Sequence, residues 1–439
     1  MKNRFRKHTL SALVLTALGT LSGNTYAAGF ALIEQNASGM GNAFAGAAAV
    51  AEDASTIFFN PAGMTRLSGS QAAVALHAID LSFKFSDKAS SKPAAIVTNP
   101  LGGNGGDAGG VAVVPNGYYM MPITERMTFG IGVNAPFGLK TEYDDTWAGR
   151  FQGIKSDLKT ININPSLAFK VSDSFSAGFG ISYQSIDVEL TNAVVLGPNT
   201  EGRTSLKADD AAWGWNVGVL FQAGPNTRIG ASYRSTIDYS LEGDVTTTTS
   251  AGTVVQAASG AANADVTMPD IASVSVAHTI NDQWEILGDI SLTRWSEIKT
   301  ITVMNSTNGT IRDILSLDFD DSYRISIGAN WKPSDSWTWK VGLAYDQTPV
   351  KGSNSRTVRL PDNDRTWLAL GAKYRLSPSG VLDFGFVHLM IGDADINFTR
   401  SQQAPGLTVP TNSPGTQSVV NGTLEGSVNI LSIQYSMSF

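Results

Sequence analysis

The chain has 439 residues, a formal net charge of -7 at pH 7 and no cysteine. Without a basic stripe it does not suit nucleic acid, and without cysteine it relies on neither disulfides nor thiol chemistry. This length normally suggests two or three soluble domains, but no charge block or Pro/Ser-rich linker divides the sequence. A single large barrel, whose strands repeat around one wall, is consistent with both this length and the undivided composition.

Residues 1–27 have the pattern of a secretory signal peptide. A basic head precedes an apolar run from Leu10 to Leu21, and Thr25-Tyr26-Ala27 provides a small-residue cleavage site. The run is too short to cross ~30 Å of hydrocarbon as a helix, which disfavours the alternative of a membrane anchor. We therefore predict an exported protein whose first mature residue is Ala28.

Residues 28–70 form a segment rich in small side chains, with no sustained period of 2 or 3.6. Such a segment cannot bury enough apolar surface to fold alone, but its backbone can pack closely inside a surrounding structure. Asn60-Pro61-Ala62 predicts a tight turn whose polar groups bond that surrounding wall, and a plain loop turn is the alternative. We predict a plug inside a tube.

From residue 71 to 439 the sequence alternates with period 2, as in Trp213, Trp215, Val217 and Val219. We predict about fourteen antiparallel strands, an even number as in bacterial single-chain barrels. Short turns alternate with long loops expected near 86–110, 138–154, 191–211, 246–265, 300–321, 346–363 and 391–423. The predicted fold class is all-β, a transmembrane antiparallel β-barrel plugged by its N-terminal segment.

A soluble β-sandwich also alternates, so the membrane assignment depends on further features. Aromatic residues gather near predicted strand ends, as in the interface girdles of membrane barrels. They are Tyr118, Tyr119, Trp284, Trp295, Trp331, Trp337 and Trp367. The chain also ends in an alternating strand that closes on Phe439, which resembles the signal that the outer-membrane barrel assembly machinery reads.

The sequence offers no catalytic or metal-binding constellation. His77, His278 and His388 stand alone in predicted strands, and no G-x-S-x-G motif accompanies them. The acids of the pairs Asp144-Asp145 and Asp320-Asp321 lack dense ligand spacing and are expected to be solvated loop charges. We predict no enzyme activity, no cofactor and no metal.

The stretch Asn134-Ala135-Pro136-Phe137-Gly138-Leu139 interrupts a predicted strand. Pro136 removes a ladder hydrogen bond and Gly138 weakens strand packing, so the strand must kink or open here. An ordinary strand end at a loop boundary is the alternative.

The opening Ala28-Gly29-Phe30, the SGMG-AFAG glycine pattern and Asn60-Pro61-Ala62 resemble the N-terminal hatch of the FadL family of outer-membrane transporters of hydrophobic compounds. The likeness continues in 134–143, in 320–324 and in Leu360-Pro361-Asp362-Asn363-Asp364-Arg365. It implies a hatch over 28–70, a barrel over 71–439, and passive uptake in the outer membrane of a Gram-negative bacterium. In this family the stretch matching 134–139 is an inward kink that leaves a lateral opening in the wall.

The family's fatty-acid prototype meets the carboxylate with basic wall residues, whose places Leu190 and Asp320 occupy here. Arg203, Lys207 and Arg312 are the candidate carboxylate contacts, with Arg234 and Arg324 as further bases. Long-chain fatty acids are the first expected ligands because they are the family's commonest assignment. Monoaromatic hydrocarbons or other uncharged compounds, which the missing bases favour, are the alternative. A structural or adhesive surface barrel is the third hypothesis, disfavoured by the plug and the kink. Expected partners are the hydrophobic ligand, outer-membrane lipid and the assembly machinery at Phe439, and the expected state is a monomer.

Overall fold

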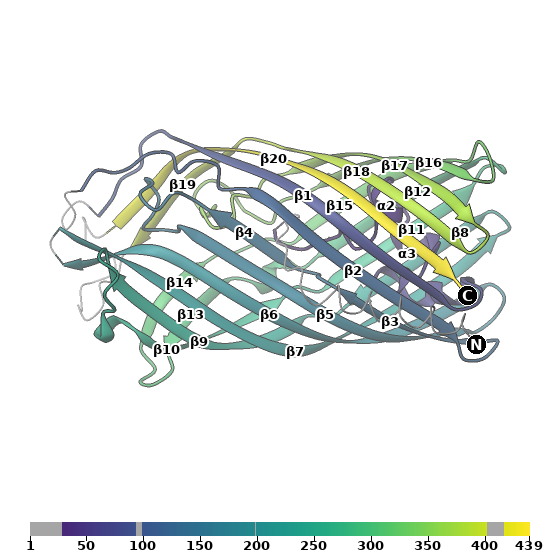
Figure 1. The fold of residues 1–439 in the computed structure, drawn as a ribbon, viewed down its shortest axis with the longest axis horizontal. Coiled ribbons are helices and arrows are strands. Elements are labelled where there is room, and N and C mark those ends of the chain that lie inside the picture. Colours follow the sequence, from purple (N-terminus) through teal and green to yellow (C-terminus); the bar gives the residue numbers. More distant parts are fainter. Residues whose placement is uncertain (1–28, 94–98, 198, 402–416) are drawn as a thin grey trace, which may run out of the picture.

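The structure is a computed structural model, and it describes residues 29–93, 99–197, 199–401 and 417–439. These residues form a closed antiparallel barrel of 14 strands, elongated along its axis (Figure 1). β1 (Gln71–Asp87) closes the wall against β20 (Gln417–Ser438), in register from Gln71↔Ser438 to Asp87↔Gly422. The predicted fold class is confirmed, whereas the predicted signal peptide and Ala28 lie outside the described residues.

The other wall strands follow one another around the barrel. They are β2 (Gly110–Pro122), β3 (Met127–Asn134) with β4 (Gly138–Glu142), β5 (Lys155–Lys170), β6 (Phe175–Gly197), β7 (Thr200–Gly224), β8 (Thr227–Arg234) with β9 (Ile237–Thr249), β10 (Gly260–Met268) with β11 (Ile271–Thr279), β12 (Trp284–Thr293), β15 (Ser322–Trp331), β16 (Trp337–Asp346), β17 (Arg365–Ser377) and β18 (Gly380–Ile391). In the described part of the chain three wall strands are interrupted, and each consists of two consecutive elements: β3 and β4, β8 and β9, and β10 and β11. Outside this set, β13 (Thr300–Asn305) and β14 (Ile311–Ser316) form a hairpin, and β19 (Ala394–Ser401) pairs with the start of β20.

Because side chains alternate with a period of 2, successive residues of a wall strand face the lipid and the lumen in turn. In β16, Trp339, Val341, Leu343 and Tyr345 are exposed on the outside, while Lys340 between them is buried inside. Because closure pairs neighbouring backbones in ladders, such a wall can lie in hydrocarbon without a helix. None of the helices among the described residues has the length and apolar character that crossing a membrane requires.

Two features of the wall differ from prediction. The loop expected at 191–211 is mostly sheet, because β6 continues to Gly197 through the apolar run Ala193–Leu196 and pairs in register with β7, which begins at Thr200. Three aromatics expected in the lipid girdle are buried inside: Tyr118, Trp295 and Trp367. Trp295 follows β12 in the short 3-10 helix η3 (Trp295–Glu297), where its indole is buried in the lumen against Phe30.

Residues 29–70 lie in the lumen and run past many wall strands. Their regular elements are short: α2 (Ala37–Met40), α3 (Ala47–Val50), α4 (Thr56–Phe59) and the 3-10 helix η1 (Pro61–Arg66). We call this segment the hatch. Figure 1 shows α2 and α3 within the barrel, toward the end at which the chain terminates.

Lumen-facing glycines of the wall make room for the hatch. A Cβ added at any of them would come within about 3 Å of hatch atoms, for example 1.9 Å from the Ala48 carbonyl oxygen at Gly230 and 2.0 Å from Asn60 Oδ1 at Gly218. We call this set the glycine belt: Gly130, Gly178, Gly218, Gly230, Gly328, Gly342, Gly371 and Gly385. The small residues of the hatch therefore meet equally small positions on the wall.

Candidate functional site

The hatch begins as a short strand that pairs with the interruption between β3 and β4. Leu32 N–H donates to the Pro136 carbonyl at 2.7 Å, and Gly138 N–H donates to the Phe30 carbonyl at 2.9 Å. Ala31 and Phe137 are bridge partners between these two bonds. The N-terminal end of the hatch thus uses the backbone of the kink as its partner strand.

At the same place the wall is not closed by a ladder. β2 pairs with β3 only from Gly117↔Val133 to Pro122↔Thr128, and within the described residues no ladder joins 110–116 to 135–141. Above this interval, Glu142 N–H donates to the Ala108 carbonyl at 3.0 Å and joins the two sides again. We call the interval the wall gap.

The hatch lies directly behind the wall gap. Asn116 Nδ2 on β2 donates to the Glu34 carbonyl at 2.9 Å, and Gln35 Nε2 donates to the Ala135 carbonyl at 2.9 Å. Tyr118 adds a bond from its hydroxyl to the Gln35 carbonyl at 3.0 Å. Residues 30–35 therefore bond to both edges of the gap and cover it from inside.

The first described residue of the hatch is fixed by a buried acid. Gly29 N–H donates to Asp362 Oδ2 at 2.9 Å, and the other oxygen of Asp362 pairs with Arg365. The ring of Phe30 packs against Trp295, with ring centroids 4.8 Å apart. Asp362 belongs to the Leu360–Arg365 motif, so that loop sets the position of the hatch terminus.

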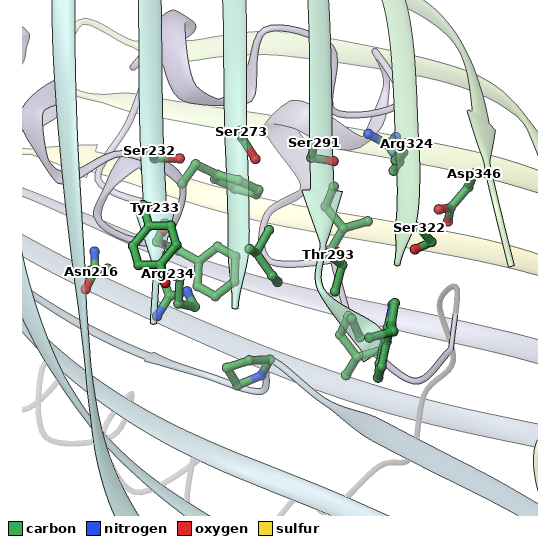
Figure 2. Close-up of a pocket in the computed structure, with 18 of the residues that line it drawn as sticks. Asn216, Ser232, Tyr233, Arg234, Ser273, Ser291, Thr293, Ser322, Arg324 and Asp346 are labelled. Carbon is green, nitrogen blue, oxygen red and sulfur yellow. Dashed lines mark hydrogen bonds between the residues drawn. The ribbon is translucent and has the colours of Figure 1, made fainter. Parts of the chain in front are cut away.

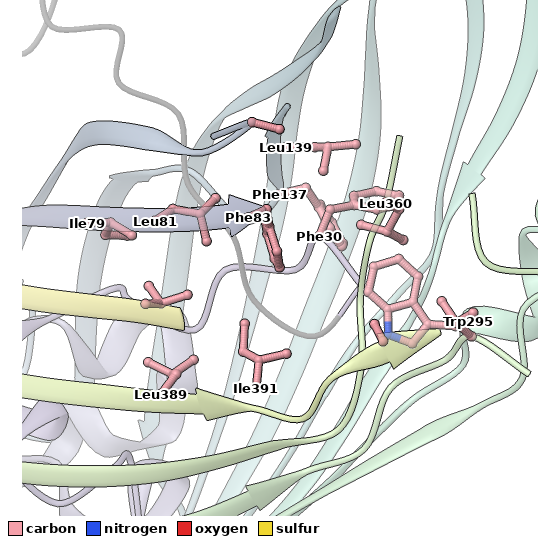
Figure 3. Close-up of a cluster of buried hydrophobic side chains, with 14 of the residues drawn as sticks. Phe30, Ile79, Leu81, Phe83, Phe137, Leu139, Trp295, Leu360, Leu389 and Ile391 are labelled. Atoms are coloured by element: carbon pink, nitrogen blue, oxygen red, sulfur yellow. The ribbon is translucent and has the colours of Figure 1, made fainter. Parts of the chain in front are cut away.

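An apolar lining continues from this point along the lumen. Figure 3 shows Phe30, Phe137 and Trp295 together, with Ile79, Leu81 and Phe83 of β1 and Leu389 and Ile391 of β18 further along. All of these side chains belong to one buried cluster. The lumen beside the hatch terminus is therefore lined mainly by apolar side chains.

A cavity of about 870 Å³ lies between the hatch and the inner wall of β7, β8, β11, β12, β15 and β16. The hatch contributes Leu32, Ile33, Phe58 and Phe59, and the kink contributes Pro136. Figure 2 shows Asn216 and Arg234 at one end of the wall face and Arg324 with Asp346 at the other. Its surface is mostly apolar but also carries several polar side chains, a combination typical of small-ligand sites.

The two buried cations of the cavity have different surroundings. Arg324 is acted on by Asp346, Asp289 and Glu34, and its guanidinium also lies 4.9 Å from the Trp367 ring centroid. Arg234 donates to Ser182 Oγ at 3.2 Å and to the Phe58 carbonyl at 3.0 Å, and lies 4.3 Å from the Phe58 ring centroid. Arg324 thus has carboxyl neighbours, whereas Arg234 has a hydroxyl, a carbonyl and an aromatic ring.

Glu34 is a buried acid in the part of the hatch that covers the gap. Neither of its carboxyl oxygens has a hydrogen-bond partner within the described residues, and the side chain is fully buried. Burial raises the pKa of Glu34 from 4.5 to about 7, while Arg365 and Arg324 act in the opposite direction and Asp346 adds to the rise. The hatch terminus therefore contains a group that gains its charge near neutral pH.

The body of the hatch is held by an ionic cluster on the opposite part of the wall. Lys340 Nζ lies 2.6 Å from Glu52 Oε1, and Lys373 pairs with the other oxygen of Glu52. Lys340 also donates to the Ser38 carbonyl at 2.6 Å and lies 3.7 Å from Asp383. This cluster joins two hatch segments to β16, β17 and β18.

The predicted hatch turn bonds to the wall. Asn60 Nδ2 donates to the Ala48 carbonyl at 2.7 Å and to the Val219 carbonyl of β7 at 2.9 Å, while Asn60 Oδ1 accepts from Ala62 N–H. Pro61 begins η1, where its missing N–H costs nothing. In the predicted lateral opening, Asn134 Oδ1 accepts from Asn162, and Leu139 belongs to the apolar cluster.

The three predicted carboxylate contacts do not line the cavity. Arg203 pairs with Asp145 at 2.7 Å, and Lys207 is largely exposed with Glu189 at 3.6 Å. Arg312 lies 3.4 Å from the Ser259 carbonyl oxygen. Their role stays a prediction, and of the bases considered from sequence the structure brings Arg234 and Arg324 to the cavity.

The sequence interpretation did not single out Glu34, Glu52 or Lys340, and it assigned Trp295 to the lipid girdle instead of the lumen. Charged residues at alternate positions of otherwise apolar strands, such as Lys340 in β16, were the available signal for the ionic cluster. Glu34 had no such signal, because the hatch has no regular period.

A family model described as outer membrane protein transport protein (OMPP1/FadL/TodX) matches residues 18–439. The chain belongs to this family. The predicted resemblance and the outer-membrane location in a Gram-negative bacterium are therefore confirmed, and members of this family are transport proteins.

Two curated relatives cover most of the chain. Outer membrane protein P1 of Haemophilus influenzae is 31% identical over 415 residues, covering 86% of this chain and 89% of that protein. The long-chain fatty acid transport protein of Escherichia coli strain K12 is 27% identical, covering 89% and 93%.

Two solved structures show the same fold. A Pseudomonas aeruginosa FadL homologue superposes with a TM-score of 0.84 at 23% identity, covering 94% of this chain and 100% of that one. The Ralstonia pickettii toluene transporter TbuX superposes with a TM-score of 0.67 at 19% identity, covering 93% and 100%. The chain is thus an outer-membrane transporter of hydrophobic compounds.

Proposed function

We propose that this protein takes up long-chain fatty acids passively, by movement of the hatch terminus and lateral release through the wall gap. The observation that carries the proposal is the backbone pairing of residues 30–32 with Pro136 and Gly138, directly behind the gap. Because that short ladder is the inner cover of the gap, separating the two strands would open a path from the lumen to the membrane.

The proposed path begins at apolar groups under the outer loops. Tyr143 and Trp147 stack with ring centroids 3.9 Å apart, and Trp147 also contacts Phe85 of β1. From there the apolar cluster leads to Phe30 and Phe137 beside the gap. A ligand that enters the adjoining cavity would displace the Gly29–Phe30 end of the hatch and leave sideways, down its gradient.

Fatty acids are proposed ahead of monoaromatic hydrocarbons because the cavity combines an apolar lining with the buried base Arg234. The Escherichia coli relative named for fatty acids also aligns over 89% of the chain. Uncharged aromatic compounds remain the second candidate, since most of the lining is apolar and needs no charge from the ligand.

A reversible disulfide between the hatch and the kink tests the mechanism. Ala31 and Phe137 are bridge partners, and the Cα atoms of such pairs are within reach of a disulfide. In cells without another transporter, the double variant Ala31→Cys/Phe137→Cys should take up radiolabelled oleate only after reduction. The native chain has no cysteine, so no other disulfide can form.

The single variants Ala31→Cys and Phe137→Cys are the matched controls and should be insensitive to the oxidant. Equal uptake by the locked and the reduced protein would overturn lateral release at this gap. Toluene uptake without oleate uptake by the wild type would favour the second candidate, and uptake of neither would return the structural or adhesive hypothesis.

A further inference from the structure

We propose that Arg234 and Asn216 form the carboxylate-binding end of the cavity, and that the hydrocarbon tail of the ligand lies toward Trp295 and Pro136. The inference deepens the proposed function, because it assigns the charged end of the ligand to residues that replace the bases missing at positions 190 and 320. It rests on three observations at this end of the cavity. Arg234 has no acidic partner, Asn216 has an unused hydrogen-bond donor, and Arg234 contacts the hatch.

Arg234 is a buried cation without an acidic partner. It forms no ion pair with Asp or Glu among the described residues, and the titratable group that acts on it electrostatically is the phenol of Tyr118. Two other lumen cations are compensated by acids, Arg228 by Glu285 at 3.4 Å and Lys340 by Glu52. Because buried charges are normally paired, an anion is the missing component at Arg234.

Asn216 supplies a second free donor at the same corner. It is the register partner of Arg234 between β7 and β8, and it is 2% exposed. Its Oδ1 accepts from Asn164 Nδ2 at 2.9 Å, whereas its Nδ2 has no partner within the described residues. A guanidinium beside an unused amide N–H provides only donors, which suits a carboxylate and not a cation or an amine.

The far end of the cavity has the opposite character. Three acids, Asp346, Asp289 and Glu34, act electrostatically on Arg324 there, so a second anion would be repelled by carboxyl groups. Phe58, Ile33 and Trp295 line the space between. A fatty acid is therefore oriented with its carboxylate at Arg234 and its tail along the hatch toward the wall gap.

Binding of the ligand at Arg234 also affects the hatch, because Arg234 contacts both. Arg234 donates to the Phe58 carbonyl in α4 at 3.0 Å and lies over the Phe58 ring. A carboxylate is a stronger acceptor than a neutral carbonyl, so it competes for these N–H groups. Ligand binding thereby weakens one attachment of the hatch while the ionic cluster at Glu52 and Lys340 remains in place.

The test separates charge from shape with two ligands. Binding of oleate and of methyl oleate is measured on the purified wild-type barrel and on Arg234→Met, Arg234→Lys and Asn216→Asp. Arg234→Met should weaken oleate binding at least tenfold and change methyl oleate binding less than twofold, with Arg234→Lys in between. Asn216→Asp places an anion beside Arg234 and should also weaken oleate selectively. Arg126→Met, in an exposed turn, is the arginine control.

Uptake of oleate by cells that express each variant separates the possible failures. Equal losses for both ligands would show that Arg234 only supports the fold, and unchanged oleate binding would place the carboxylate elsewhere. Either result overturns the inference while wild-type uptake keeps the proposed function. A wild type that neither binds nor takes up oleate overturns both. Asn216→Asp is nearly isosteric, so it tests the site even if Arg234→Met does not fold.

Discussion

The amide of Gly29 and the carboxylate of Asp362 lie 2.9 Å apart, although 333 positions separate them in the chain. The bond joins the start of the hatch to the loop before β17. Asp362 also pairs with Arg365, so its carboxylate has a second partner that does not belong to the hatch.

Asp362→Asn should loosen the hatch terminus. The neutral amide is a weaker acceptor and no longer compensates Arg365, so hydrogen exchange at Gly29–Leu32 should become faster by about tenfold or more. Exchange in the strands of the barrel should not change. Asp364→Asn, in the same loop, is the control, since Asp364 bonds to Tyr345 and Thr348 and not to the hatch. Equal effects of the two variants would contradict the prediction that the Gly29–Asp362 bond specifically holds the hatch terminus.

Docking of the hatch terminus should depend on pH through Glu34. Its pKa is raised from 4.5 to about 7 in the docked state, so docking binds a proton between these values. The docked state is then most favoured below pH 4.5, and it loses roughly 3 kcal/mol as the pH rises through 7.

A spin label on a cysteine introduced at position 33 should accordingly be more mobile at pH 8 than at pH 5. Glu34→Gln should remove this difference and hold the label in its low-pH state throughout. A pH response that persists in Glu34→Gln would assign the titration to another group.

The glycine belt predicts that a single added side chain can displace the hatch. In Gly218→Val the new Cβ would lie 2.0 Å from Asn60 Oδ1, so the turn at Asn60 must leave the wall. A barrel of this size conducts when its plug is displaced, so the ion conductance of the variant in planar bilayers should rise several-fold. Gly224→Val, whose Cβ meets no atom within 4 Å, should conduct like the wild type.

The ionic cluster predicts a large loss of stability on removal of one partner. Lys340→Met leaves Glu52 with Lys373 alone and Asp383 less compensated, which should cost about 3–5 kcal/mol as for other broken buried pairs. The temperature at which the barrel loses its compact electrophoretic mobility should fall. Lys332→Met, exposed in a turn, should not lower it. If both variants melt alike, the cluster contributes little.

The sequence by itself determined the barrel, because lipid and lumen impose a period of 2 that can be read strand by strand, as in β16. It also indicated that the aperiodic segment before Gln71 needs a surrounding wall, and that a strand cannot run regularly through Pro136 and Gly138.

Only the tertiary structure decided which distant residues meet in the lumen. Trp295 and Tyr118 looked like girdle aromatics, because the alternation does not say which face is lipid where a strand ends or a short helix intervenes. Arg234 could not be separated from Arg203 and Lys207, since these two differ from it by having a nearby acid, and that depends on neighbouring strands. Arg312 differs from Arg234 by its place outside the cavity, which the sequence does not give either. Charge compensation is a property of three-dimensional neighbours, and closure of the barrel alone brings them together.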